Sequence, residues 1–378
     1  MIRFLLPLFL CALVCPLHAA DGKAVEGPRI RVAIMRGSPA LKLKTSARIY
    51  VVEVKTGTKY QLLANSSYEI RSSGNAITVA GQQLASPVKL SAADGGERVR
   101  LGGRLYKGDI LIKAAGTGRI DIIESLSIED YLCGVLPAEM SPDWPLEALK
   151  AQAVASRTYA LKQINLANEY DMTDGSEMQV YKGSAGVNPR ILEAVNSTRG
   201  EVLKYKRKLI TAFFHSCCGG HTASVNSAWG EDVIKPLYGV PDPFCSNSKH
   251  YHWDFFISSK DLLTFVQKHG STALKITGIK IQQKDNSGRA LKLKIYTDSG
   301  SETVLTKDIR TTFGGFEFKS TLLTHIAAVK GGFEFQGRGW GHGVGMCQEG
   351  ARTMAEKRYN YRKILRHYYP GVSIEDFE

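Results

Sequence analysis

Residues 127–163 decide the architecture expected for this chain, and they read SIEDYLCGVLPAEMSPDWPLEALKAQAVASRTYALKQ. Ser127 stands three residues before Asp130, which is the spacing of a capping box with Asp in place of Glu, so a short helix is predicted to begin there. Pro145 presets the backbone angle of a first helical turn. Residues 146–163 then contain good helix formers and no Gly or Pro, which predicts a second, stronger helix.

A single carboxylate, Glu139, follows a Pro-Ala pair between the apolar residues Leu136 and Met140. Apolar surroundings disfavour the charged form of a carboxyl group, so its pKa is expected to rise toward the range of a general acid. With the spacing alone, a glutamate in such a stretch is more often an exposed helix residue. Glu139 is therefore a candidate catalytic residue that needs further support.

Two cations, Lys150 and Arg157, lie seven residues apart on the second helix and so share one face. Because Leu146 and Ala153 flank that line, we expect the face to pack partly against protein while it presents both cations into a cleft. The alternative is a pair of surface cations on an amphipathic helix.

Upstream of this stretch, short segments alternate in polarity and are separated by Gly, Asn and Ser. Period-two alternation bounded by turn residues predicts strands. The predicted strands cover residues 29–36, 48–54, 75–80 and 108–113. Residues 27–115 are therefore expected to form a β-rich N-terminal domain.

Downstream, strands are predicted at 275–282 and 290–297 around a turn at Asp285–Gly288. Residues 251–335 are interpreted as an inserted β-rich subdomain within a mixed α/β catalytic domain, which is expected at 116–378. Residues 351–367 are expected to be helical. The whole chain is predicted to be α+β.

Export is expected from the first twenty residues, which carry Arg3, an apolar run over 4–17 and a small-residue end. This is the pattern of a signal peptide, and its apolar core is too short for a comfortable membrane span. A lipidated Cys15 is the second interpretation, although Val14 occupies a position where a small residue is expected. The predicted location is the periplasm or cell-wall space, with no transmembrane span after removal of the signal.

The formal net charge is +13. Outside the cytoplasm, such a charge favours an anionic polymer or membrane surface as partner over nucleic acid. The alternative is that the charge serves solubility alone.

Beyond the predicted signal, the chain has five cysteines, and export permits disulfides between them. Four candidate metal ligands stand close together in the sequence: Cys217, Cys218, His221 and Cys245. They could hold zinc, although they are more closely spaced than in common zinc fingers. A disulfide from Cys245 to Cys217 or Cys218 is the other interpretation, and both stay open.

Glycine occupies every second position over 337–345, and no Lys-Ser or Lys-Thr follows, so a phosphate loop is not indicated. Such glycines let one backbone approach another, or a sugar ring. Trp340 and His342 are expected to project between them.

Taken together, these segments closely resemble the stage II sporulation protein D and amidase-enhancer family. The resemblance rests on residues 129–140 and 144–160, and on ordered landmarks at 179–181, 216–222, 229, 242–243, 318–320, 339–348 and 368–371. It covers roughly residues 104–372. A departure is Cys347-Gln-Glu, where many relatives have Ser-Gln-Tyr, and it suggests that Cys347 joins the other cysteines.

The resemblance implies a lytic transglycosylase that cleaves peptidoglycan glycan strands, in some members strands without stem peptides, with Glu139 as acid/base. The resemblance also assigns the helix cations one of two roles: they bind the lactyl carboxylate or other acceptors of the muramic acid, or they support Glu139 by hydrogen bonding. The substrate-binding residues expected on this basis are Lys150, Arg157, Gln179, Tyr181, Trp340, His342 and Gln348. No cofactor is required for this chemistry, and the family's cysteine and histidine zinc site makes a structural zinc one interpretation of the cysteine cluster.

Two rival functions remain at this stage. The protein could be a non-catalytic activator of a separate cell-wall amidase, as the wider family's name implies, with Glu139 in a structural role. Alternatively, the cysteine and histidine cluster could be the catalytic zinc centre of a hydrolase, but no His-Glu-x-x-His arrangement supports this.

Overall fold

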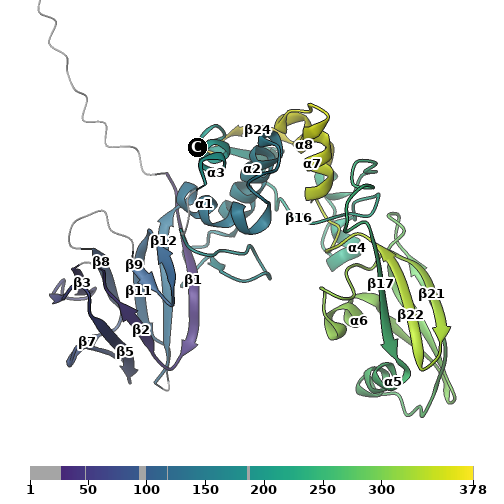
Figure 1. Ribbon diagram of the computed structural model, residues 1–378, viewed down its shortest axis with the longest axis horizontal. Coiled ribbons are helices and arrows are strands. Elements are labelled where there is room, and N and C mark those ends of the chain that lie inside the picture. Colours follow the sequence, from purple (N-terminus) through teal and green to yellow (C-terminus); the bar gives the residue numbers. More distant parts are fainter. Residues whose placement is uncertain (1–26, 47, 93–98, 117, 185–187, 378) are drawn as a thin grey trace, which may run out of the picture.

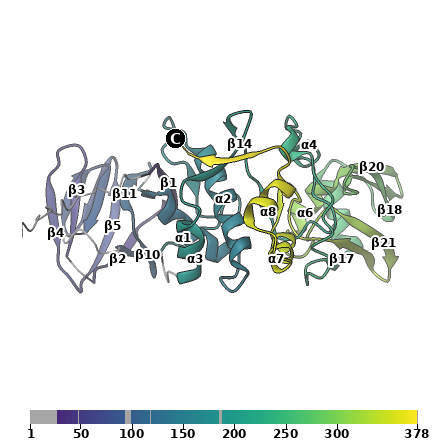
Figure 2. The same cartoon turned by 90° about the horizontal axis from the view of Figure 1, so that it is seen from above.

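The computed structural model describes residues 27–46, 48–92, 99–116, 118–184 and 188–377, and it has the predicted α+β fold. The predicted signal peptide and the alternative lipidation site at Cys15 lie outside the described residues. Figure 1 shows three parts in a row: strands at the N-terminal end, a group of helices in the middle, and a second group of strands beyond them. Figure 2 shows the same order from above.

Two antiparallel-rich sheets make up the N-terminal part. The first has the order β13 (Met172–Thr173), β1 (Arg29–Ser38), β12 (Ile120–Ser127), β11 (Asp109–Ala114), β8 (Val88–Ala92), β3 (Ile49–Glu53), β4 (Lys59–Leu62). The second has the order β10 (Arg104–Tyr106), β9 (Val99–Leu101), β2 (Leu41–Lys44), β5 (Ser67–Ser73), β6 (Ala76–Val79), β7 (Gln82–Ala85).

Alternating burial along these strands holds the two sheets together. Ile110 and Ile112 of β11 are buried, as are Ile77 and Val79 of β6, and all four belong to one hydrophobic cluster. Side chains two residues apart point to the same face of a strand, so each sheet contributes one apolar face to this cluster. The four strands predicted in this region are confirmed.

The middle part consists of helices packed around α2. They are α1 (Ile128–Glu139), α2 (Leu146–Gln163), α3 (Pro189–Asn196), α7 (Gln348–Glu356) and α8 (Tyr361–Tyr368). As predicted, Ser127 caps α1, and its hydroxyl oxygen accepts from the amide of Asp130 at 3.2 Å. Most of α2 is buried, because α1, α3, α7 and α8 all contact it (Figure 2).

Residues 351–367 are helical as expected, except for a break at 357–360 that separates α7 from α8. Arg358 takes a left-handed conformation in this break, with φ +66°. Asn360 then caps α8 by accepting from the amide of Lys363 at 2.9 Å.

Short strands tie the middle part together. β14 (Glu201–Tyr205) pairs with β15 (Lys208–Leu209) and with β24 (Ser373–Asp376). β16 (Phe214–His215) pairs in parallel with β23 (Met346–Cys347), which brings the segment after His215 beside Cys347. Helix α4 (Val225–Trp229) and the 3₁₀ turn η1 (Lys235–Leu237) follow.

The third part has its own hydrophobic cluster. One sheet contains β17 (His252–Ser258), β22 (Gly332–Arg338) and β21 (Leu323–Val329); the other contains β18 (Ile276–Lys284), β19 (Ala290–Thr297) and β20 (Gly300–Leu305). Helices α5 (Ser259–Lys268) and α6 (Thr306–Phe313) accompany them. The strands predicted at 275–282 and 290–297 are confirmed, and the division of the chain into domains remains a proposal. Among the described residues, no helix combines the length and apolar character needed to cross a membrane.

Candidate active site and cysteine centre

Glu139 is the last residue of α1, and it lies half-buried between the buried residues Leu136 and Met140. The helix stops here because Met140 adopts an extended conformation, while its amide still donates to the Leu136 carbonyl. The carboxyl group therefore stands at the end of a rigid helix whose preceding turns are anchored in the core.

The surroundings of Glu139 favour its protonated form. Burial raises the pKa of this carboxyl, and two hydrogen bonds partly offset that effect by lowering it. These bonds come from the Val180 amide, at 3.1 Å from Oε1, and from the side chain of Gln348. A carboxyl group with a raised pKa keeps its proton to higher pH than an exposed glutamate and can give it to a bound group.

Two glutamines support this geometry from different elements. The Gln348 amide group donates to the side chain of Gln152 on α2 at 3.4 Å, and Gln348 is itself buried. Gln179 is fully buried, where it accepts from the Tyr131 hydroxyl at 3.1 Å and donates to the Ser156 carbonyl at 3.3 Å. Gln348 thus contacts Glu139 directly, whereas Gln179 fixes the backbone next to Val180 and is too buried for the predicted substrate contact.

Tyr181 does not lie where a sugar could stack on it. Its ring is 1% exposed, and it stacks on Tyr131 with ring centroids 5.2 Å apart. Its hydroxyl donates to the buried carboxylate of Glu124 at 2.7 Å. The predicted substrate contact of Tyr181 is therefore wrong, because the structure uses this residue in the core beneath α1.

Arg157 is also placed differently from the prediction. Its guanidinium group is fully buried and donates to both oxygens of Glu129, at 2.9 and 2.6 Å, and to the carbonyls of Val195 and Glu201. Glu129 lies at the start of α1, while Glu139 ends that helix, so about 15 Å of helix separates them. Arg157 does not reach an open cleft, and the substrate contact predicted for it is corrected.

Lys150 lies on the same face of α2 and pairs with Glu147 at 3.1 Å. The spacing argument identified the shared face correctly. The expected cleft in front of that face is not found at Arg157, because other helices enclose α2 and its polar residues have protein partners. A substrate contact from the half-buried Lys150 remains a prediction.

The glycine-rich loop 337–345 brings backbones together, as expected. A side chain at Gly339 would place its Cβ 2.5 Å from the Cys217 carbonyl oxygen, and one at Gly345 would overlap the Phe213 carbonyl. Trp340 is half-buried and donates from its indole to the Gly315 carbonyl at 3.0 Å. Sugar contacts from Trp340 remain a prediction.

His342 projects from the same loop and is half-buried among the rings of Phe213, His215 and Trp229. Burial lowers its pKa to about 4. Its Nδ1 accepts from the Val344 amide at 3.0 Å. His342 is therefore a neutral side chain near pH 7, suited to hydrogen bonding and ring contact rather than to carrying charge.

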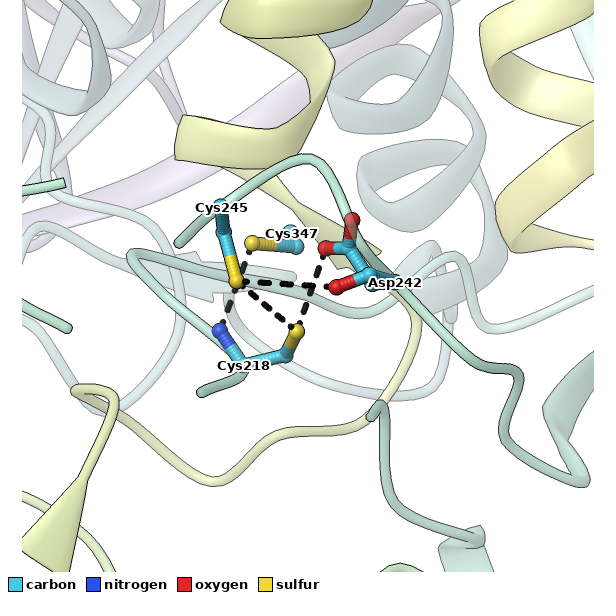
Figure 3. A group of neighbouring side chains, drawn as sticks. All are labelled: Cys218, Asp242, Cys245 and Cys347. Carbon is cyan, nitrogen blue, oxygen red and sulfur yellow. Dashed lines mark hydrogen bonds between the residues drawn. The ribbon is translucent and has the colours of Figure 1, made fainter. Parts of the chain in front are cut away.

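A second site gathers the thiols of Cys218, Cys245 and Cys347 with the carboxylate of Asp242, and their ligand atoms all lie within 4.8 Å of one another. Figure 3 shows these four side chains pointing toward one another. The Sγ atoms of Cys218 and Cys245 are 3.4 Å apart. No disulfide joins any of the described cysteines, which are all free thiols.

Cys217 lies beside this cysteine centre, but its ligand atom is not among the four that lie within 4.8 Å of one another. Its thiol interacts with those of Cys245 and Cys347, so Cys245 receives hydrogen bonds from three thiols, which lower its pKa. His221 does not belong to it, because its Nδ1 bonds to the Thr222 carbonyl at 2.7 Å and no ligand atom of His221 lies in the group. The predicted ligand His221 is therefore corrected.

Backbone amides point at the sulfur atoms of the cysteine centre. The amide of Gly220 donates to Cys218 Sγ, and those of Cys218 and Gly350 donate to Cys347 Sγ, each at 3.3 Å. A buried guanidinium, that of Arg289, donates to the Cys218 carbonyl at 2.7 Å. Three thiols and one carboxylate, with amide donors to two of the sulfur atoms, fit a tetrahedral zinc ion, which accepts thiolate and carboxylate ligands.

Sequence reasoning missed Asp242 and Arg289 as members of this site. In the sequence, Asp242 stands out only as part of the landmark at 242–243. Its Oδ2 accepts from the Cys218 thiol at 3.1 Å and from the Tyr368 hydroxyl at 3.0 Å, so it links the cysteine centre to α8. Residues 218, 242, 289 and 347 come together only in the tertiary fold, so no local sequence spacing predicts their contact.

With the surroundings of Glu139 and the cysteine centre described, the chain can be compared with known proteins. Residues 116–205 match the model of the stage II sporulation protein family, and residues 237–345 match a domain of unknown function. The first match contains α1, α2 and Glu139.

Relatives that match about two thirds of the chain agree with this family. An uncharacterized protein of Brachyspira hyodysenteriae is 40% identical over 259 residues, covering 68% of each chain. The stage II sporulation protein D of Bacillus subtilis is 31% identical over 278 residues, which cover 67% of this chain and 76% of that protein. The amidase enhancer of Bacillus subtilis is 31% identical over 294 residues, but they cover only 40% of the enhancer. The chain therefore belongs to the stage II sporulation protein D family.

Proposed function

We propose that the protein is a lytic transglycosylase that cleaves the bond between N-acetylmuramic acid and N-acetylglucosamine in peptidoglycan glycan strands, in the wall space outside the cytoplasm. The observation that carries this proposal is Glu139, a half-buried carboxyl group at a fixed helix end with a raised pKa. Membership in the family and the net charge of +13 also support a wall polymer as partner.

In the proposed reaction, Glu139 first protonates the oxygen that leaves with N-acetylglucosamine. The 6-hydroxyl of the muramic acid then attacks its own C1, and Glu139 takes the proton that this hydroxyl loses. The glycosidic C–O bond breaks, an internal C–O bond forms, and the product ends in an anhydro ring. Ordinary glycoside hydrolysis uses a second carboxylate, which either activates a water molecule or attacks the sugar directly. An intramolecular nucleophile with a high effective concentration does not require one.

Val180 and Gln348 have defined parts in this mechanism. After the first proton transfer Glu139 is an anion, and the Val180 amide and the Gln348 side chain stabilise it by donating hydrogen bonds. Burial then favours return of the proton. The same carboxyl group can act as acid and as base because these two effects oppose one another.

A second candidate function is activation of a separate wall amidase. The similarity to the amidase enhancer of Bacillus subtilis favours it. Mass spectrometry of products from purified glycan strands separates the two: anhydro-muramic ends support the transglycosylase. Intact strands together with faster release of stem peptides by an added amidase would support the activator.

For the cysteine centre we propose a structural zinc ion held by Cys218, Asp242, Cys245 and Cys347, whose ligand atoms all lie within 4.8 Å of one another. The free thiols, their mutual contacts and the amide donors support this set. Such an ion would tie the loop after β16 to the start of α7, and Gln348, the residue after Cys347, contacts Glu139. Its part is therefore to hold Gln348 in place, with no role in the bond-breaking step.

A further inference from the structure

A cleft of about 510 Å³ lies where α4, the β18–β19 pair, α6 and the glycine-rich loop meet. Its volume falls in the range of about 300–1,000 Å³ that is usual for ligand sites. Glu139 does not line it. Its lining includes the side chains of Trp229, Lys292, Lys307, Arg310 and His342.

The lining of this cleft has charge of one sign. It includes Lys292, Lys307 and Arg310 and contains no acidic residue. Arg310 is half-buried, and its Nε donates to the Lys319 carbonyl at 3.2 Å. Burial lowers the pKa of this guanidinium, and no carboxylate of the described residues counters that effect. An anion in the cleft would supply the missing partner.

An aromatic surface stands beside these cations. Trp229 is 40% exposed at the end of α4, and its ring lies 5.0 Å from that of His342 and 4.6 Å from that of Phe213. Because His342 is neutral, it adds ring surface and hydrogen bonding without charge. An exposed indole next to cations suits a ligand with an apolar face and an anionic group.

A row of rings connects the cleft with the helix that supports the acid site. Tyr159 of α2 lies 5.9 Å from Phe213, which in turn contacts Trp229. One turn earlier on α2, the Ser156 carbonyl accepts from Gln179, whose neighbour Val180 donates to Glu139. A continuous series of side-chain and backbone contacts along α2 thus links the cleft to the elements that hold Glu139.

We propose that this cleft is a carbohydrate subsite that binds an anionic sugar unit through Arg310 and Lys307 while the sugar ring packs on Trp229. The anion is the lactyl carboxylate of a muramic acid residue in the strand; the identity of that polymer rests on the proposed function above. A phosphate group on a wall polymer would offer similar chemistry, and the experiment distinguishes the two.

The test measures binding in a Glu139→Gln background, so that strands are not cleaved. The probes are peptide-free glycan strands, the same strands with their carboxylates reduced to alcohols, and chitin oligosaccharides, which lack the lactyl group. Arg310→Gln and Lys307→Gln should each weaken binding of the native strands about tenfold and leave binding of both neutral probes unchanged. Trp229→Ala should weaken binding of all three. Lys280→Gln, which removes a charge from β18 outside the cleft, is the matched control and should bind as the parent does.

Equal affinity for native and reduced strands would overturn the proposal, and so would an equal loss in the Lys280 and Lys307 variants. Stronger competition by inorganic phosphate than by free muramic acid would overturn the carboxylate assignment. If the wild type forms anhydro ends while the cleft variants bind unchanged, this inference fails and the proposed function stands. Charge-dependent binding in the cleft without any strand cleavage by the wild type would contradict the proposed function alone.

Discussion

Replacing Arg157 by methionine should destabilise the protein without removing a glycan contact. The change leaves the Glu129 carboxylate buried and without its guanidinium partner. Breaking a buried pair in this way costs about 3–5 kcal/mol, since the remaining charge is uncompensated. The carbonyls of Val195 and Glu201 lose a donor as well. At about 2.1 cal/mol/K of unfolding entropy per residue, the apparent Tm of a chain of this size should fall by roughly 4–7 °C.

Thermal unfolding followed by circular dichroism measures this loss, and glycan affinity is measured on the folded variant at low temperature. Lys150→Met is the matched control, because Lys150 lies two turns away on α2 in a more exposed pair with Glu147. Its loss should be about 0.2–1 kcal/mol. A Glu129→Leu/Arg157→Met double variant, which removes both charges, should recover much of the stability. If Arg157→Met unfolds like the wild type and yet loses glycan affinity, the burial argument is wrong and the arginine contacts substrate.

Three further predictions concern the acid site, the core beneath it and the cysteine centre. The acid form of Glu139 exists below its raised pKa, so kcat/KM should fall as the pH rises through that pKa. Gln348→Ala removes a hydrogen bond that lowers this pKa, so a pH–rate profile of the variant should show the fall at higher pH. Tyr181→Phe should destabilise by about 1–3 kcal/mol in urea unfolding, since the buried Glu124 loses its donor, and should leave glycan affinity unchanged. Protein purified without chelator should contain about one zinc ion per chain by metal analysis, and its thiols should be titratable after denaturation. Cys347→Ser should lower both the metal content and the Tm. Masked thiols without zinc would instead mean disulfides.

The local structure of the chain could be predicted well because its signals are local. Ser127 and Asp130 predict the start of α1, alternating side chains predict the N-terminal strands, and Asp285–Gly288 predicts a turn. Each depends on residues within a few positions of one another. The break within the helical stretch 351–367 was not predicted, because Arg358 and Asn360 end one helix and start another inside a segment with helical composition.

The surroundings of individual side chains could not be predicted in the same way. Arg157 and Tyr181 carry polar groups that suit a glycan, but the fold gives them the buried partners Glu129 and Glu124. Periodicity gives the face on which a residue lies and not the element that covers that face. The cysteine centre shows the same limit, since Asp242 joins it through a contact between distant segments.

The most direct test of the account is the fate of glycan strands digested in ¹⁸O-labelled water by the wild type and by Glu139→Gln. The amide cannot exchange the required proton, so the variant should fold, bind strands and release no anhydro-muramic product. The wild type should release that product without taking up ¹⁸O, because the muramic acid's own 6-hydroxyl is the nucleophile. Reducing ends that carry ¹⁸O would show attack by water. Anhydro product from Glu139→Gln at the wild-type rate would contradict the role of Glu139.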